Sequence, residues 1–214
     1  YGLPALNGRA VKQGTEWVRA GGPEDQLDRA TGLRRAHAAT MLLLGLPGST
    51  YLYQGEELGL HEVAEISDDE RQDPAFFRGG EYDGLGRDGC RVPLPWTATG
   101  ESFGFGSGGS HLPQPAWFAG SAVEVESADP SSTLSLYRRA LGLRRDLQTG
   151  EGLEWIETGR DDVLRFRRPN GWEIVTNFGT DPFPLGPGAE RVVLGSAPDG
   201  CLPGETTAWI APTA

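Results

Sequence analysis

The sequence predicts a unit of an α/β barrel followed by a small antiparallel β domain. Residues 42–60 read LLLGLPGSTYLYQGEELGL, the pattern of an apolar helix end, a Pro-Gly turn, a four-residue strand at 51–54 and a polar turn. Together these fit one unit of a (β/α)8 barrel, in which functional groups lie at the carboxyl ends of the strands; by spacing alone, any other α/β protein is the alternative. Further along, Asn170-Gly171 separates two strand-like runs, which is a strong signal for a β-hairpin.

The glycine and proline content limits the fold classes that this chain can adopt, and its net charge limits the partners that it can bind. The 214 residues include 32 glycines and 16 prolines, about twice the usual combined share of about 12%, which predicts long ordered loops rather than a helical bundle. The net charge of −11 at pH 7 argues against nucleic acid or an anionic membrane surface as a partner, because both need clustered cations. We therefore expect neither of these partners.

The usage of cysteine, histidine and methionine gives further expectations. Cys90 and Cys201 fit a reducing compartment, with a disulfide between them as the alternative. The three histidines are scattered and no metal-ligand spacing occurs, so we expect no metal and no cofactor. We find no signal peptide and no apolar run of about 18 residues, so we expect a cytoplasmic location. Because the chain begins with Tyr1 and its only methionine is Met41, we expect it to be a piece of a longer protein.

The first 60 residues predict a turn-rich start and one long helix. Residues 1–23 read as a loop with at most one short helix. From Glu24 onwards the pattern becomes helical, with carboxylates in the first turns that complement the helix dipole. Pro47 and Gly48 end the helix. Its apolar stripe, which includes a packing histidine, consists of Leu27, Ala30, Leu33, His37, Met41 and Leu44.

A second helix and a set of strands follow in the last third of the chain. Asp129-Pro130 begins the helix and Gly150 ends it. Its apolar residues form two adjacent stripes that face a core: Leu136, Ala140, Leu143 and Leu147, and beside them Leu134, Tyr137 and Leu141. Strand-like runs then occur at 153–157, 163–167, 172–178, 191–194 and 206–210.

Two blocks of the sequence resemble a known enzyme family. Residues 45–59, GLPGSTYLYQGEELG, resemble the segment around the eighth barrel strand of α-glucosidases in the α-amylase superfamily (glycoside hydrolase family 13). Residues 86–96, GRDGCRVPLPW, resemble the next landmark of the maltase and oligo-1,6-glucosidase branch. The resemblance implies that residues 1–150 are the C-terminal end of a TIM (β/α)8 barrel, with its last helices and strand eight. Residues 151–214 would be a small antiparallel β-sandwich domain.

The resemblance also implies a role for the long segment between the two predicted helices. Residues 60–128 have no sustained periodicity, and in the family this region is a loop that shapes the substrate site. Its aromatic rings could stack on sugar rings or simply anchor the loop. These aromatic residues are Phe76, Phe77, Tyr82, Trp96, Phe103, Phe105, Trp117 and Phe118.

The catalytic carboxylates are expected outside this chain. A retaining glycosidase needs two carboxyl groups about 5–5.5 Å apart, whereas Glu56 and Glu57 are adjacent at a strand end and should point in different directions. In the family, the nucleophile, the acid and a third, transition-state-stabilising aspartate come from earlier strands. The resemblance therefore implies no catalytic residue here. It gives supporting roles at the barrel mouth to Tyr53, Gly55, Glu57 and Asp88.

Arg91 is the strongest candidate for a substrate contact. A guanidinium offers rigid paired donors that suit sugar hydroxyls or a carboxylate. In the resembling α-glucosidases, the arginine at this position holds the non-reducing glucose and pairs with an upstream aspartate; the alternative is an ordinary surface arginine. Arg87 is a weaker candidate, because it could instead pair with Asp88 to shape the loop.

The resemblance implies an intact enzyme that releases glucose from the non-reducing end of short α-glucosides by double displacement. Its partners would be small oligosaccharide or disaccharide α-glucosides and the remainder of its own barrel. One alternative is a transglucosylating or isomerising relative of the trehalose synthase or sucrose isomerase type. Another is a catalytically inactive barrel scaffold, such as an amino-acid transporter heavy subunit. Residues 1–150 argue against a free-standing β module.

Overall fold

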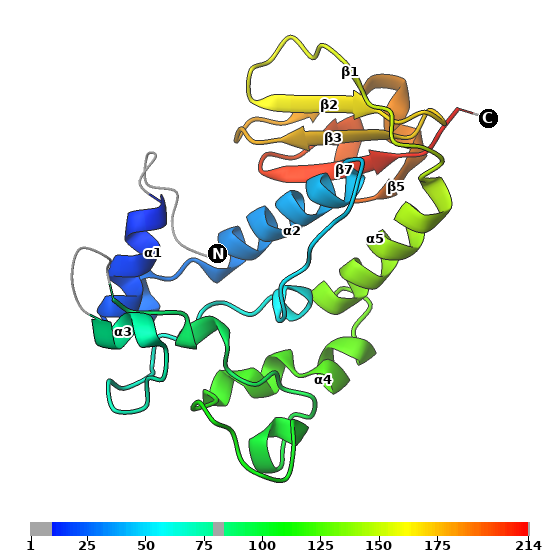
Figure 1. The fold of residues 1–214 in the computed structure, drawn as a ribbon. Coiled ribbons are helices and arrows are strands. Elements are labelled where there is room, and N and C mark those ends of the chain that lie inside the picture. Colours follow the sequence, from blue (N-terminus) through cyan, green and yellow to red (C-terminus); the bar gives the residue numbers. More distant parts are fainter. Residues whose placement is uncertain (1–9, 79–83, 214) are drawn as a thin grey trace. The chain divides into compact units, whose positions relative to one another are not determined.

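The computed structural model describes residues 10–78 and 84–213. The chain divides into two compact units (Figure 1). The first unit consists of Tyr1–Leu33 and Tyr53–Ser135, and the second of Arg34–Leu52 and Leu136–Ala214. Among the described residues, no helix is both long and apolar enough to cross a membrane.

The first unit is built from short helices and connecting loops. Its α-helices are α1 (Ala10–Arg19), α3 (Pro74–Arg78) and α4 (Val123–Ala128), and it includes the first turns of α2 (Arg29–Gly45) and of α5 (Thr133–Leu147). Short 3₁₀ helices occur at η1 (Glu24–Gln26), η2 (Glu56–Leu58), η3 (Asp88–Cys90), η4 (Glu101–Gly104) and η5 (Ala116–Ser121).

The long helix predicted from Glu24 begins later, at Arg29. Glu24 lies in the separate turn η1, and Leu27 then takes an extended conformation with φ −103° and ψ 108°. Asp28 caps α2, because its Oδ1 accepts a hydrogen bond from the Thr31 N–H at 3.0 Å. The predicted start was therefore wrong, five residues too early. Asp28 lies just before the helix and caps its first turn, rather than lying within that turn.

The strand predicted at 51–54 does not join a sheet among the described residues. Residues 51–53 have no regular secondary structure, Gln54 lies in a turn, and Tyr51 is 92% exposed. A strand is held by hydrogen bonds to a neighbouring strand, and no described segment pairs with this one. Sequence pattern alone cannot supply that neighbour.

The second unit contains the predicted antiparallel sheet (Figure 1). Five antiparallel strands follow the order β1-β2-β3-β7-β5, and the two short strands β4 and β6 form a second sheet. The strands are β1 (Glu154–Trp155), β2 (Val163–Arg167), β3 (Glu173–Asn177), β4 (Phe183–Pro184), β5 (Val192–Leu194), β6 (Cys201–Leu202) and β7 (Thr206–Ile210). The sequence analysis missed β4 and β6, which are too short to show an alternating pattern.

The Asn170-Gly171 hairpin is confirmed. It joins β2 to β3, which pair in register from Val163↔Asn177 to Arg167↔Glu173. Gly171 has φ +89°, a left-handed conformation that favours glycine. Asn170 accepts a hydrogen bond from the Trp172 N–H (3.1 Å) and donates one to the Leu147 carbonyl (2.6 Å). The turn residues thus also fix the hairpin to the end of α5.

The leucine stripe of α5 is covered by the sheet, as predicted. Leu136, Leu143 and Leu147 pack against a buried cluster that joins α2, α5 and one face of the sheet. Figure 1 shows the ribbons of α2 and α5 beside the sheet. The cluster consists of Met41, Leu44, Ala140, Phe166, Trp172, Ile174, Leu194 and Trp209. A second cluster, which includes Val175, Phe183 and Leu202, covers the other face. Strand β3 is consequently buried along its whole length.

An ion cluster in the second unit should make its stability depend on pH. The Glu205 carboxylate accepts hydrogen bonds from Arg35 Nε (2.8 Å) and Arg34 Nη2 (2.5 Å). The bonds from Arg35, then those from Arg34, hold the pKa of Glu205 below its ordinary value of 4.5. A lowered pKa contributes stability above the unfolded-state pKa, and this contribution is lost as pH falls through the folded-state pKa.

We therefore expect Glu205→Gln to reduce the urea midpoint at pH 7, and this deficit to shrink as pH falls below 4.5. Glu190→Gln is the matched control, because Glu190 is exposed in the same unit. A Glu205→Gln deficit that is unchanged at pH 3 would show that the carboxylate charge contributes nothing.

Candidate functional site

The block of residues 86–96 lies in the first unit and depends on two close backbone approaches. A Cβ added to Gly86 would lie 2.5 Å from the Asp73 Cβ, and Gly86 has φ +69°. A Cβ added to Gly89 would lie 2.5 Å from the Val63 carbonyl oxygen, and the Val63 N–H donates back to the Gly89 carbonyl at 3.0 Å. These glycines let the loop lie directly on its neighbours.

Asp88 is buried, with 2% of its surface exposed. Its Oδ2 accepts hydrogen bonds from the backbone N–H groups of Gln72 and Asp73, both at 3.1 Å. Arg87 is exposed, and among the described residues no ion pair joins it to Asp88. Asp88 therefore fixes the segment at 72–73, so the alternative that it pairs with Arg87 was wrong.

Arg91 is held by a carboxylate that sequence analysis did not identify. Its Nη1 donates to Asp73 Oδ2 at 2.8 Å, and its side chain remains 44% exposed. The same carboxylate accepts the N–H groups of Ala75 (2.8 Å) and Arg87 (2.9 Å), and only 9% of the Asp73 side chain is exposed. The Ala75 N–H first, then the Arg87 N–H and the Arg91 charge, lower the pKa of Asp73.

A weak signal for Asp73 exists in the sequence. Asp73-Pro74 begins α3, and Asp129-Pro130 is the same pattern of capping residue and first-turn proline, although α5 begins only at Thr133 and the start predicted at Asp129 was wrong. That pattern predicts a helix start, but it gives no hint that the carboxylate also binds an arginine 18 residues away.

The turn after residue 54 carries the other predicted supporting residues. Gly55 has φ +91°, and its N–H donates to Glu57 Oε2 at 2.8 Å. Glu57 thus stabilises its own turn. Tyr53 lies beside the arginine block, with its hydroxyl 3.7 Å from Cys90 Sγ. The Cys90 thiol raises the pKa of Tyr53, and Arg91 acts in the opposite direction.

The two blocks line one small pocket of about 70 Å³ in the first unit. Tyr53 and Gly55 contribute from one block, and Gly89 and Cys90 from the other. Glu62 also lines this pocket, and burial raises the pKa of its carboxyl. Sequence reasoning missed Glu62, because it lies in a stretch without periodicity or motif. The pocket brings together residues 53–62 and 89–94, as a site built from these two blocks requires.

The aromatic residues of the long loop divide into anchors and exposed rings. Phe118 is 1% exposed in a cluster with Val63, Ile66, Val92 and Leu112, and Trp117 stacks on His61 with ring centroids 4.1 Å apart. By contrast, Phe77, Trp96 and Phe105 are at least half exposed. Tyr82 lies outside the described residues.

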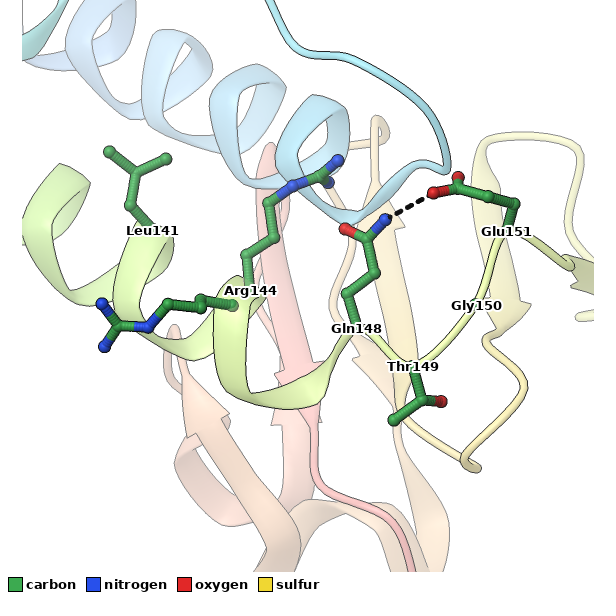
Figure 2. Close-up of a pocket in the computed structure, with 7 residues that line it drawn as sticks. Leu141, Arg144, Gln148, Thr149, Gly150 and Glu151 are labelled. Atoms are coloured by element: carbon green, nitrogen blue, oxygen red, sulfur yellow. Dashed lines mark hydrogen bonds between the residues drawn. The ribbon is translucent and has the colours of Figure 1, made fainter.

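The second unit has a larger hollow of about 470 Å³, whose main polar side chains already form hydrogen bonds within the chain (Figure 2). Arg144 lines it but donates to the carbonyls of Leu44, Leu46 (2.9 Å) and Gly48 (2.7 Å), which ends α2. Glu151 accepts hydrogen bonds from Gln148 (3.0 Å) and from the Gly48 N–H (2.5 Å). Because the chain itself uses these polar groups, the small pocket of the first unit is the better candidate.

Comparison with known proteins identifies the class. Residues 25–150, more than half of the chain, match the family model described as the alpha amylase catalytic domain. The chain belongs to the α-amylase family, glycoside hydrolase family 13, and is similar to its α-glucosidases. The match implies that the chain includes a fragment of a TIM barrel; antiparallel sheets accompany it.

Individual relatives refine this picture. The chain is 41% identical over 145 residues to a "Probable alpha-glucosidase" of Rhizobium meliloti (strain 1021), covering 65% of this chain and 25% of that protein. It is 29% identical over 198 residues to "Amino acid transporter heavy chain SLC3A1" of Rattus norvegicus, covering 83% and 27%. Among solved structures, the alpha-glucosyl transfer enzyme XgtA has a TM-score of 0.66 at 31% identity, covering 92% of this chain and 38% of XgtA. The chain thus spans about a quarter of the length of these curated relatives.

Proposed function

We propose that this chain is the C-terminal part of a retaining α-glucosidase that releases glucose from the non-reducing end of short α-glucosides. The observation that carries the proposal is Arg91, which is half-exposed, is held on one side by the buried Asp73, and lies in the chain between two pocket-lining residues, Cys90 and Val92. The 41% identity to a probable α-glucosidase supports it. In this proposal, residues 1–150 are the last part of the barrel, with 60–128 as its substrate-shaping loop. Residues 151–214 are the β-sandwich domain.

Each site residue then has a defined part. Arg91 donates hydrogen bonds to hydroxyls of the glucose unit, and the exposed Arg87 is a second, weaker contact. Tyr53 and Gly55 line the pocket, and Glu57 and Asp88 support the loops around it. The nucleophile, acid and third carboxylate come from the remainder of the barrel, which is the partner of this chain. No residue of the chain is given a role in bond cleavage.

The substrates in this proposal are neutral sugars. The net charge of −11 favours them over nucleic acid or anionic membranes. The proposed location is the cytoplasm, where the two cysteines, Cys90 and Cys201, would stay reduced.

A second candidate function is transglucosylation, favoured by the 31% identity to an alpha-glucosyl transfer enzyme. Hydrolysis and transfer share the first displacement and differ only in whether water or a sugar accepts the glucosyl group. The products therefore distinguish them: free glucose indicates hydrolysis, and longer or isomeric glucosides indicate transfer.

The proposed function is tested with the whole protein that contains this chain. We expect release of nitrophenol from a nitrophenyl α-glucoside, with the α-anomer of glucose appearing first in proton NMR. The β-anomer appearing first would contradict retention, and a folded protein inactive on every α-glucoside would favour the scaffold alternative. The 214-residue chain alone should release no nitrophenol above a mock preparation. Activity of the chain alone would contradict the placement of the catalytic carboxylates elsewhere in the barrel.

A further inference from the structure

We infer that Asp73 is the positioning residue for Arg91: its carboxylate fixes the guanidinium so that the exposed part faces the substrate. This inference rests on the proposed function and deepens it, because it adds a residue that the two matched blocks do not contain. Asp73 lies in neither residues 45–59 nor residues 86–96.

The first support is the number of bonds that meet on this one carboxylate. Oδ1 accepts the Ala75 N–H at 2.8 Å, and Oδ2 accepts both the Arg87 N–H at 2.9 Å and Arg91 Nη1 at 2.8 Å. A carboxylate with three donors on it and 9% of its side chain exposed has little freedom to move. Its bond to Arg91 therefore restrains the guanidinium as well.

The second support is the loop that surrounds Asp73. This loop holds the backbone N–H of Asp73 and has a glycine where the Asp73 side chain needs space. Asp88, itself 2% exposed, accepts the Asp73 N–H at 3.1 Å. Gly86 passes so close to the Asp73 side chain that a Cβ there would lie 2.5 Å from it. Four residues of the 86–96 block therefore contact Asp73: Gly86, Arg87 through its N–H, Asp88 through its carboxylate and Arg91 through its side chain.

The third support is the difference in exposure between the two partners. The Arg91 side chain is 44% exposed and that of Asp73 is 9% exposed. The buried member acts as the support, and the half-exposed member can still reach a ligand. A long flexible side chain that is held on one side pays less entropy when it binds a sugar hydroxyl.

The test is a double-mutant cycle in the whole enzyme with Asp73→Asn and Arg91→Ala. Asn keeps the size of the side chain and one carbonyl acceptor. Its NH₂ group, however, replaces a carboxylate oxygen and faces the N–H donors that this oxygen accepted. We expect Asp73→Asn to lower kcat/KM about 10-fold, mainly through a higher KM. In the Arg91→Ala background the same substitution should change kcat/KM less than about twofold, because a residue that acts through another has no separate effect. Additive effects would overturn the inference.

Two further measurements separate positioning from general support. Asp129→Asn is the matched control, because Asp129 also precedes a proline and accepts the N–H of the residue two positions on (Ser131, 2.8 Å), and has no arginine on it among the described contacts. It should leave KM unchanged. The second measurement needs no activity: a crystal structure of the Asp73→Asn protein should show the Arg91 guanidinium displaced or disordered. An Arg91 that keeps its place would overturn the inference even if the proposed glucosidase function failed.

Discussion

Replacement of Arg91 with alanine should lower the catalytic efficiency of the intact enzyme roughly 10- to 150-fold. A charge-assisted hydrogen bond to a substrate hydroxyl contributes about 1.5–3 kcal/mol, which corresponds to that range in kcat/KM. The loss could exceed it, because Arg91→Ala also leaves the buried Asp73 carboxylate without its cation. Efficiency should be measured on maltose and isomaltose, with thermal melting to check that the variant is folded.

Two matched variants sharpen this result. Arg91→Lys should restore only part of the activity, because an ammonium cannot reproduce the paired donors of a guanidinium. Arg145→Ala is the control, since Arg145 is 82% exposed and contacts only Asp146, at 3.5 Å, among the described residues. If well-folded Arg91→Ala keeps its efficiency within twofold of the parent, then Arg91 is a surface arginine and the pocket assignment fails.

The parts of the fold that could be predicted are those specified by local sequence. Asn170-Gly171 determines a hairpin through its own turn geometry, and the structure has this hairpin between β2 and β3. The leucine stripe of α5 repeats over several turns, so its buried face is readable from spacing alone. Both signals are complete within about 15 residues and need no distant partner.

The predictions that failed depended on distant partners or on very short elements. The segment 51–54 has strand composition, but a strand exists only with a neighbour, and none of the described residues supplies one. Strands β4 and β6 have two residues each, fewer than one alternation requires. The start of α2 moved from Glu24 to Arg29 because carboxylates favour positions before a helix as well as in its first turn.

In the candidate site, too, residues within a contiguous block could be predicted and residues brought in by distant contacts could not. Arg91 was predicted from its block of contiguous residues. In the structure its neighbours Cys90 and Val92 line one pocket with residues 53–56, whereas Arg91 itself does not line it. Asp73 and Glu62 were missed, although one holds Arg91 and the other lines the pocket. Carboxylates are common in this acidic chain, so type and position alone did not distinguish these two. Only the three-dimensional contact does.

Trp209 should be the residue whose loss destabilises the second unit most. It is fully buried on β7 opposite Ile174 of β3, and its ring meets Trp172 edge to face with centroids 4.9 Å apart. Its indole Nε1 donates to the Met41 carbonyl at 2.9 Å, so it also fixes α2 to the sheet. A large aromatic side chain at such a position fills the core and satisfies a buried acceptor at the same time.

We therefore expect Trp209→Ala to lower the free energy of unfolding by about 3–5 kcal/mol, through the cavity it leaves and the lost hydrogen bond to the Met41 carbonyl. Since a domain is typically stable by about 5–15 kcal/mol, this loss would bring the unit close to unfolding. Urea denaturation followed by circular dichroism measures it. Trp209→Phe, which keeps a ring but no indole N–H, should lose about 1–3 kcal/mol, and Trp155→Ala, at a site 59% exposed on edge strand β1, about 0.5 kcal/mol. A Trp209→Ala loss no larger than that of Trp155→Ala would mean that the contact of α2 with the sheet does not stabilise this unit.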